Sequence, residues 1–323
     1  MIDDDHSLLD LVTGYQPPAV IAAAQRIGLF EVLPGVPRSA EDLAREISAD
    51  PSNLAALLDA LTSLGLVDAT TEGYSATSYA ARRLGRDGEM ALVVAKEAVF
   101  AEAWTRLDRV VLEGRPAMEP WRSQLETDPE RALAFLEALD VLARIGGPPL
   151  HELGALAPGR RVLDVGGGLG AYSRILDAAG SEVTLVDLPP VAAWAADRLA
   201  STGVSVVAVD LFEHPSCGVA PASKDAALVS HLLHDLPRER GIDLLRRVRN
   251  TLVSEGRVVV NDFAADSGPG AFGALFDVMM RVETGGAAHS RATLEAMLGE
   301  AGFAGVEPLP YEDPLTLYVG TRP

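Results

Sequence analysis

The chain has 323 residues, of which 48% are hydrophobic, so it is long enough for two domains that each bury a core. Its formal net charge of −19 repels phosphate groups, and we expect neither a nucleic acid nor an anionic membrane as a partner. Cys217 is the single cysteine, which excludes an intrachain disulfide and a cysteine-based metal site and makes a reducing cytoplasm the expected location.

The N-terminal part of the chain predicts helices. Its acidic start lacks the basic and apolar stretches of a signal peptide, and the sequence holds no apolar run of about 18 residues, the length of a membrane span. The spacing of apolar residues predicts a helix over Pro17–Leu33. A capping box predicts a helix over Ser39–Ile47, and Asp50 followed by proline predicts the start of a helix that ends at Gly65.

Two short strand-like pieces follow, around Leu66-Val67 and Tyr74-Ser75, with a turn at Glu72-Gly73 between them. Together with the preceding helices they predict a winged-helix arrangement. A DNA-reading helix carries donors to phosphates and base edges, whereas Pro51–Gly65 contains neither Lys nor Arg. We therefore expect the leucines of this helix to pack against another helix or a second subunit.

Longer helices are predicted over Glu89–Leu112 and Asp128–Ile145, the second of which opens with Asp-Pro. The run Gly146–Pro149 is the clearest break in the helical pattern, because glycine and proline end helices. We expect a domain boundary here. Residues 1–146 then form a helical, winged-helix-like domain, and residues 147–323 form a second domain.

The second domain alternates strands with helices. Near-continuous apolar strands separated by helices predict a parallel sheet that is covered on both faces, which is a Rossmann-like α/β fold. Ligands bind such sheets at the carboxyl ends of the strands, near the point where the strand order reverses. The expected strands are Arg161–Val165, Glu182–Asp187, Val204–Val209, Ala226–Ser230, Arg257–Asp262, Val306–Leu309 and Leu315–Gly320.

A glycine-rich turn follows the first of these strands, in the segment RVLDVGGGLG over Arg161–Gly170. Three consecutive glycines allow a turn so tight that a ligand approaches bare backbone, and a helix is predicted after it, at Ala171–Ala179. The carboxylate of Asp164 would repel the pyrophosphate of a dinucleotide but suits a cationic cofactor without phosphate. The segment favours S-adenosylmethionine, with a dinucleotide or a purely structural turn as alternatives.

Polar residues stand at the ends of the next two strands. Asp187 is placed to accept hydrogen bonds from both hydroxyls of a ribose, and a solvated acid at a strand end is the alternative. Asp210 is placed to accept from the amino group of adenine, and Leu211 and Phe212 offer apolar contact to the ring. For Phe212, ordinary core packing is the alternative.

Two histidines follow the strand that ends at Ser230. His234 is expected at the same edge of the sheet as the acids, where a neutral imidazole takes a proton from a hydroxyl nucleophile as its bond to a methyl group forms. A purely structural histidine is the alternative. His231, His234 and Asp235 also suggest a metal site, but their spacing is not that of a recognised ligand motif, so we expect no metal.

In this order and spacing, the motifs resemble the family of S-adenosylmethionine-dependent small-molecule O-methyltransferases of plant phenylpropanoid and bacterial polyketide pathways. The resemblance covers nearly the whole chain. Its N-terminal motifs are Arg26–Phe30, Ser39–Leu43, Leu61–Leu66, Trp104, Gly114–Ala117 and Asp128–Glu130. Its C-terminal motifs are Leu163–Gly168, Val186–Pro189, Asp210–Phe212, Leu233–Asp235, Gly285-Gly286 and Ala301–Phe303.

The resemblance implies a class I methyltransferase sheet, an N-terminal dimerisation domain that joins a homodimer, S-adenosylmethionine as cofactor and a small-molecule acceptor. The glycines would line the methionine moiety, and Ser230 would hold a polar end of the cofactor. His234 falls on the catalytic base, Asp235 lies beside it, and Asp262 falls where the family often has a Glu that orients the base. The full expected cofactor set is Asp164, Gly166, Gly167, Gly168, Asp187, Leu188, Asp210, Leu211, Phe212 and Ser230.

Three residues depart from the family pattern. Ala288 replaces a second acid that supports the base, His289 replaces an Arg, and Leu236 replaces a common Trp. The cofactor site is thus complete, while the catalytic set is partial. The leading hypothesis is methyl transfer to a hydroxyl of an aromatic or polyketide-like metabolite. The alternatives are N- or C-methylation and a reaction that keeps the cofactor without methyl transfer; a nicotinamide oxidoreductase does not fit Asp164 or the His-Asp motif.

Overall fold

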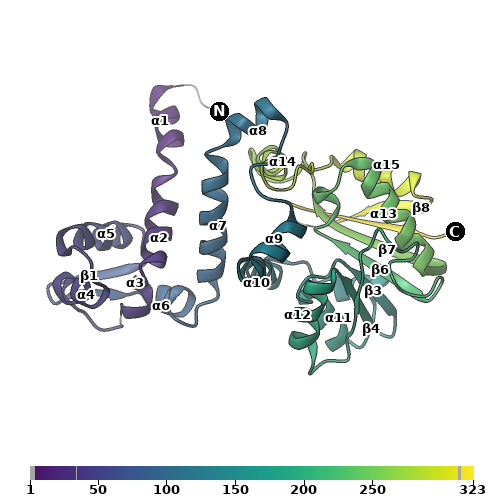
Figure 1. The fold of residues 1–323 in the computed structure, drawn as a ribbon, viewed down its shortest axis with the longest axis horizontal. Helices are drawn as coiled ribbons and strands as arrows, with labels where there is room; N and C mark the ends of the chain where they lie inside the picture. The colour runs from purple at the N-terminus through teal and green to yellow at the C-terminus, as the bar shows by residue number, and fades with distance from the viewer. Residues whose placement is uncertain (1–3, 34, 312–313) are drawn as a thin grey trace. The chain divides into compact units, whose positions relative to one another are not determined.

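The computed structural model describes residues 4–33, 35–311 and 314–323. The chain forms two compact units, Met1–Glu102 and Ala103–Pro323 (Figure 1). Residues 103–146, which we expected in the N-terminal domain, belong to the second unit, because Leu125 and Ala132 pack against Val191 there. The boundary between the compact units therefore lies before residue 146. The domain organisation predicted from the sequence stays a prediction.

The first unit begins with three helices: α1 (Asp5–Thr13), α2 (Gln16–Arg26) and α3 (Leu29–Val32). The single helix predicted over Pro17–Leu33 is therefore wrong. Gly28 has a φ of +69°, in the left-handed region, and this residue separates α2 from α3. The helix α1 was not predicted, although Asp4 caps it by accepting from the backbone N–H of Ser7 at 2.7 Å.

Two capped helices and a hairpin complete the winged-helix-like part. Helices α4 (Ala40–Ile47) and α5 (Pro51–Ser63) begin at the predicted caps, since Ser39 accepts from the N–H of Asp42 and Asp50 from that of Asn53. Strands β1 (Val67–Thr70) and β2 (Gly73–Ala76) pair antiparallel. The leucines of α5 that are buried, Leu54, Leu58 and Leu61, pack into the core of this unit. Helices α6 (Ser78–Leu84) and α7 (Met90–Trp104) follow.

The second unit begins with short helices that the sequence predicted only in part. The helix predicted over Glu89–Leu112 is broken, because α7 ends at Trp104 and α8 (Leu107–Glu113) begins after it. Helix α9 (Trp121–Thr127) was not predicted, whereas α10 (Pro129–Gly146) was, with Asp128 as its cap. Helices α9 and α10 share an apolar cluster with α12 (Pro189–Leu199).

The predicted α/β sheet is confirmed, with seven strands in the order β5-β4-β3-β6-β7-β9-β8. Strands β3 to β7 pair parallel, whereas β9 pairs antiparallel with β7 and β8, so the sheet is mixed rather than wholly parallel. Because β3 lies between β4 and β6, the strand order reverses there and leaves a site at the strand ends. The strands are β3 (Arg161–Val165), β4 (Glu182–Asp187), β5 (Ser205–Ala208), β6 (Lys224–Ser230), β7 (Leu252–Phe263), β8 (Ala304–Leu309) and β9 (Leu315–Thr321).

Helices cover both faces of this sheet. Alternate residues of one strand reach opposite faces, so Val258 and Val260 enter one core and Val259 the other. Helices α13 (Arg238–Thr251) and α15 (Arg291–Glu300) pack in the first core, and α11 (Ala171–Ala178) packs in the second. The remaining elements are helix α14 (Phe272–Glu283) and the short 3₁₀ turns η1 (Leu150–Glu152), η2 (Gly154–Leu156) and η3 (Leu233–Asp235).

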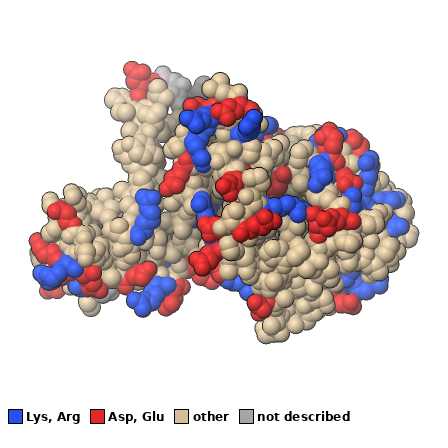
Figure 2. All heavy atoms as spheres, viewed as in Figure 1, with Lys and Arg blue, Asp and Glu red and all other residues tan. Residues whose placement is uncertain are grey.

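Charged side chains of both signs are interspersed on the face that Figure 2 shows. Acidic and basic groups pair across elements, as Arg238 of α13 does with Glu300 of α15. In the part of the chain that the structure describes, each helix is too short or too polar to cross a membrane.

Candidate active site

The turn after β3 is shaped by glycines, and other residues at these positions would strain the backbone or displace neighbouring side chains. Gly166 and Gly168 have φ of +67° and +55°, which side-chain-bearing residues rarely adopt. A Cβ on Gly167 would lie 2.8 Å from the carboxyl carbon of Asp164 and 2.8 Å from a methyl of Leu185. The turn therefore presents bare backbone at the carboxyl end of β3, where α11 begins.

Asp164 lies beneath this turn rather than in solvent. Its side chain is buried, and its Oδ2 accepts a hydrogen bond from the hydroxyl of Ser173 at 2.7 Å. Burial raises the pKa of Asp164 to about 6, because the charged form loses water. The carboxylate therefore supplies negative charge under the turn, and its expected role toward the cofactor stays a prediction.

Asp187, at the end of β4, is held by the same turn. Its Oδ2 accepts from the backbone N–H of Gly168 at 2.9 Å, and its Oδ1 accepts from that of Leu188 at 2.7 Å. Each carboxylate oxygen has a second lone pair, so two acceptor positions stay open to a diol. Burial outweighs these hydrogen bonds and raises the pKa of Asp187 to about 6.

Asp210 follows β5 and is linked to Asp187 through the backbone, since the N–H of Val209 donates to the Asp187 carbonyl at 2.8 Å. Its own Oδ1 accepts from the N–H of Phe212 at 3.0 Å. Leu211 is buried in the core, and the ring of Phe212 packs partly against that core. Four residues of the expected cofactor set thus lie at or just after the ends of β4 and β5: Asp187, Asp210, Leu211 and Phe212.

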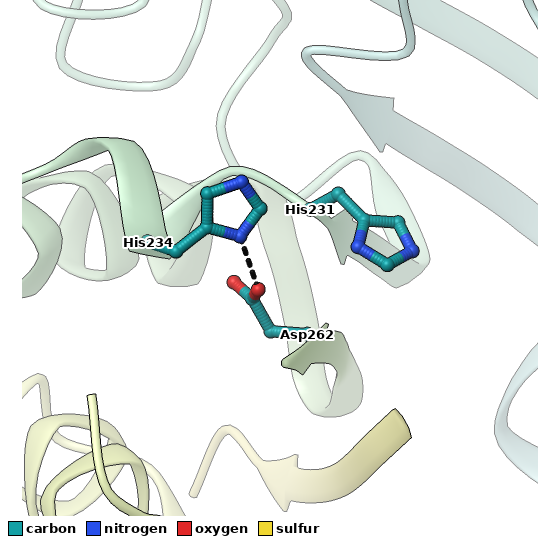
Figure 3. A group of neighbouring side chains, drawn as sticks. All are labelled: His231, His234 and Asp262. Atoms are coloured by element: carbon teal, nitrogen blue, oxygen red, sulfur yellow. Dashed lines mark hydrogen bonds and ion pairs between the residues drawn. The ribbon is translucent and has the colours of Figure 1, made fainter. Parts of the chain in front are cut away.

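His234 lies in η3, directly after β6, and its ring faces Asp262 at the end of β7 (Figure 3). The Nδ1 of His234 forms a short hydrogen bond with Oδ1 of Asp262, whose other oxygen accepts from the N–H of Leu233 at 3.2 Å. With Nδ1 donating, Nε2 is the nitrogen free to take a proton, and it lies 3.8 Å from Oδ1 of Asp235.

The acids around His234 decide its charge. Burial alone would lower the pKa of this imidazole, but the carboxylates of Asp262 and Asp235 outweigh burial and raise it to about 9. His234 in turn lowers the pKa of Asp262 against the effect of burial. At pH 7 the ring is therefore largely protonated.

His231 lies beside this pair. Its ring centroid lies 6.2 Å from that of His234 and 4.9 Å from that of Phe263, and burial lowers its pKa to about 4. One ligand atom each of His231, His234 and Asp262 lie within 4.8 Å of one another, so the structure brings together a group that sequence spacing did not suggest. His234 and Asp262 form a hydrogen bond with each other instead, and this bond orients the ring of His234.

The residues that depart from the family pattern form the wall beside His234. Ala288 is buried among Phe276 and Met280, so an apolar surface stands where the family has a second acid. The Nε2 of His289 lies 3.2 Å from the carbonyls of Leu233 and Leu236, at the two ends of η3. His289 therefore stabilises the loop that carries the histidine.

Aromatic rings line the region around the base. The ring of Phe276 meets that of His234 edge to face at 5.1 Å, and Phe263 contacts Phe276 at 4.9 Å. Phe272 stacks on Phe276 with centroids 6.1 Å apart. These rings come from β7 and α14 and pack against one another in the stacked and edge arrangements that aromatic pairs prefer, so the surroundings of the base are largely apolar.

A buried polar group next to Ser230 was missed in the sequence. Asn261 donates from Nδ2 to the Ser230 hydroxyl at 2.9 Å and lies 3.4 Å from the Tyr172 hydroxyl, while its Oδ1 is buried without a partner among the described residues. Asn261 precedes Asp262 at the end of β7, so its position at a strand end was the signal that would have found it.

Comparisons with known proteins agree on one family. A model described as "O-methyltransferase domain" matches residues 104–304, and one described as "O-methyltransferase dimerisation domain" matches residues 9–86. The 3-hydroxy-5-methyl-1-naphthoate 3-O-methyltransferase of Streptomyces sahachiroi is 30% identical over 95% of this chain and 92% of its own length. The phenazine-1-carboxylate N-methyltransferase of Pseudomonas aeruginosa is 28% identical over 92% and 91%.

Among solved structures, that of human N-acetylserotonin methyltransferase in complex with SAM superposes with a TM-score of 0.86 at 23% identity. The superposition covers 99% of this chain and 98% of that one. At this level of identity the likeness concerns the fold alone.

Proposed function

Since the chain belongs to the O-methyltransferase family, we propose that it transfers a methyl group from S-adenosylmethionine to a hydroxyl of a small aromatic or polyketide-like metabolite. The observation that carries the proposal is the position of the His234–Asp262 pair beside the glycine-rich turn. Leu232, two residues before His234, would lie 3.0 Å from a Cβ on Gly166, so the turn and the loop of the base are neighbours.

The residues at the strand ends fit this cofactor. Two open acceptor positions on Asp187 suit the ribose diol, and Asp210 suits the amino group of adenine. The bare backbone at Gly166–Gly168 gives room for the methionine moiety, and buried Asp164 favours a positive charge nearby. When bound, S-adenosylmethionine would supply a methyl group to the acceptor oxygen, and the bond between that methyl carbon and the sulfur would break to leave S-adenosylhomocysteine.

The protein then has two tasks at the acceptor. The rings of Phe263, Phe272 and Phe276 hold a flat molecule and exclude water, so that the hydroxyl lies in line with the methyl group. His234 takes the hydroxyl proton at Nε2, while Asp262 holds the Nδ1 proton and stabilises the imidazolium that forms. Asp235 borders the same nitrogen and is placed to contact the acceptor.

The test is methyl transfer detected by mass spectrometry, with purified protein, S-adenosylmethionine and a panel of hydroxylated aromatic acids. The panel begins with 3-hydroxy-5-methyl-1-naphthoate, the acceptor that the name of the Streptomyces sahachiroi relative gives. We expect His234→Ala to lower turnover by about 10²–10⁴-fold and to leave the affinity for S-adenosylhomocysteine within about twofold. A loss of less than about tenfold would show that positioning alone drives the reaction.

A second candidate, methyl transfer to nitrogen, is favoured by one finding: the Pseudomonas aeruginosa relative carries that activity in its name. A ring nitrogen has no proton to lose, so a base would be unnecessary. The two candidates separate in the same assay, because an N-methylating enzyme would tolerate His234→Ala and would methylate phenazine-1-carboxylate rather than a phenol.

A further inference from the structure

Arg122 reaches the candidate adenine site from a helix that the sequence did not predict. Its Nη2 lies 2.5 Å from Oδ2 of Asp210, a residue 88 positions further along the chain. The apolar side of the same helix, α9, belongs to a cluster in which Trp121 and Leu125 pack with Leu188. Two independent contacts therefore join α9 to two residues of the expected cofactor set, Asp210 and Leu188.

The hydrogen bonds of Asp210 fix the direction of its free lone pairs. Oδ1 accepts from the N–H of Phe212 at 3.0 Å, and Oδ2 accepts from Arg122, so each oxygen keeps one acceptor position. Arg240 lies over the Phe212 ring, 3.7 Å from its centroid, and adds a second positive charge nearby. Together with the Phe212 N–H, these charges lower the pKa of Asp210 against the effect of burial, so the group is an acceptor without a proton to donate.

We propose that Arg122 is a positioning residue that sets the base selectivity of the cofactor site. By holding Asp210 as a fixed, charged acceptor, it favours a base with an amino group at this position over one with a carbonyl oxygen. The inference rests on the proposed cofactor and deepens it, because it concerns how the base is read. Without Arg122, the carboxylate turns more freely, and both the attraction for the amino group and the repulsion of the carbonyl weaken.

The test compares two ligands by calorimetry: S-adenosylhomocysteine and its deaminated analogue S-inosylhomocysteine, which carries a carbonyl oxygen in place of the amino group. In Arg122→Ala we expect the affinity for S-adenosylhomocysteine to fall about tenfold, the effect of one charge-assisted hydrogen bond, while the affinity for the analogue rises because its carbonyl is repelled less. The ratio of the two affinities thus falls. Arg122→Gln, which keeps a neutral donor, should give an intermediate ratio.

Two controls separate this role from general support of α9. Arg131→Ala removes an exposed arginine from the neighbouring helix α10, and we expect it to leave both affinities unchanged. In an Asp210→Ala background, Arg122→Ala should have little further effect on either ligand.

The inference is overturned if Arg122→Ala weakens both ligands by the same factor, which indicates a structural role, or if it changes neither. A wild-type protein that binds neither ligand overturns the proposed cofactor and this inference together, so the two failures are distinguishable.

Discussion

The carboxylate of Asp187 joins the glycine-rich turn to the proposed ribose site, and its protonation is expected to control cofactor affinity. Its pKa of about 6 lies above the ordinary value, so the charged acceptor is present at pH 7 and is lost as the pH falls below about 6. A protonated carboxyl accepts hydrogen bonds from a diol less well.

We therefore predict that the affinity for S-adenosylhomocysteine, measured by calorimetry, weakens as the pH falls from 7 to 5. The slope should approach about tenfold per pH unit for each proton taken up. Asp187→Asn should bind more weakly at pH 7, by about 1–3 kcal/mol. Any pH dependence left in that variant reports Asp164, whose pKa is also about 6. A flat profile in the wild-type protein would contradict the role of Asp187.

The pKa of His234, which Asp262 raises, determines how we expect turnover to depend on pH. Only neutral imidazole accepts a proton, and the pKa of His234 is about 9, so the rate should rise with pH up to about 9. In Asp262→Asn, the carboxylate that raises this pKa most is gone, while Asp235 still raises it and burial still lowers it. The midpoint of kcat/KM against pH should then shift downward by more than one unit, with a lower plateau because the ring is oriented less well. An unchanged midpoint would exclude His234 as the titrating base.

The same pKa has a consequence for stability. The pKa of His234 is raised in the folded state, so the protonated ring stabilises the fold fully below the ordinary value of 6.5, and this contribution is lost as the pH rises through about 9. We predict that the free energy of unfolding in urea falls between pH 6.5 and 9 in the wild-type protein and falls less in His234→Ala. Equal falls in both proteins would place the effect elsewhere.

The turn between β3 and α11 is the element whose backbone the cofactor would approach. A Cβ at Gly167 would lie 2.8 Å from both Asp164 and Leu185, which are buried and cannot move aside freely. We predict that Gly167→Ala lowers the unfolding temperature and weakens binding of S-adenosylhomocysteine by at least about tenfold, the equivalent of 1.4 kcal/mol.

A glycine in α15 offers a matched control. Gly299 is exposed, and a Cβ there would meet nothing within 4 Å, so alanine should stabilise the helix by about 0.5–1 kcal/mol. Scanning calorimetry should therefore show shifts of opposite sign for the two variants, with cofactor affinity unchanged in Gly299→Ala. A neutral Gly167→Ala would mean that the turn is more adaptable than its packing indicates.

Helices and strands were predicted correctly where one local sequence pattern, such as a helix cap or an apolar run, was clear. The caps at Ser39 and Asp50 and the apolar strands of the sheet were placed within a few residues, because capping and side-chain alternation depend on neighbours in sequence. The helix break at Gly28 was missed, because the sequence does not distinguish a glycine that stays helical from one that adopts the left-handed conformation.

The candidate site could be predicted in large part because parallel strands bring their ends to one edge. Asp187 ends a strand, and Asp210 and His234 each follow one, so their sequence positions alone place them there. Arg122 could not be predicted, because its contact with Asp210 spans 88 positions and depends on where α9 packs. The sequence showed at Ala288 only that an acid of the family pattern is absent, and the apolar packing around this residue came from the structure.

In the single chain, the helix α1 leaves apolar side chains uncovered. Leu8, Leu9, Leu11 and Val12 of α1, and Tyr15 just after it, are all exposed, although other leucines of the same unit, such as Leu29 and Leu58, are buried in its core. Exposed apolar clusters of this kind mark interfaces between proteins. The match to an O-methyltransferase dimerisation domain begins at residue 9, within α1, so a second copy of the chain is the partner that we propose for this helix.

We predict that light scattering at micromolar concentration gives a particle of twice the chain mass of 34.0 kDa. The paired substitution Leu11→Asp and Val12→Asp places charges where apolar surface would be buried, so it should shift the mass toward that of one chain. The substitution Val36→Asp introduces the same kind of charge at an exposed residue of the same unit outside α1, and it should leave the mass unchanged. A wild-type particle of 34.0 kDa would contradict the dimer, and a dimeric paired variant would place the interface away from α1.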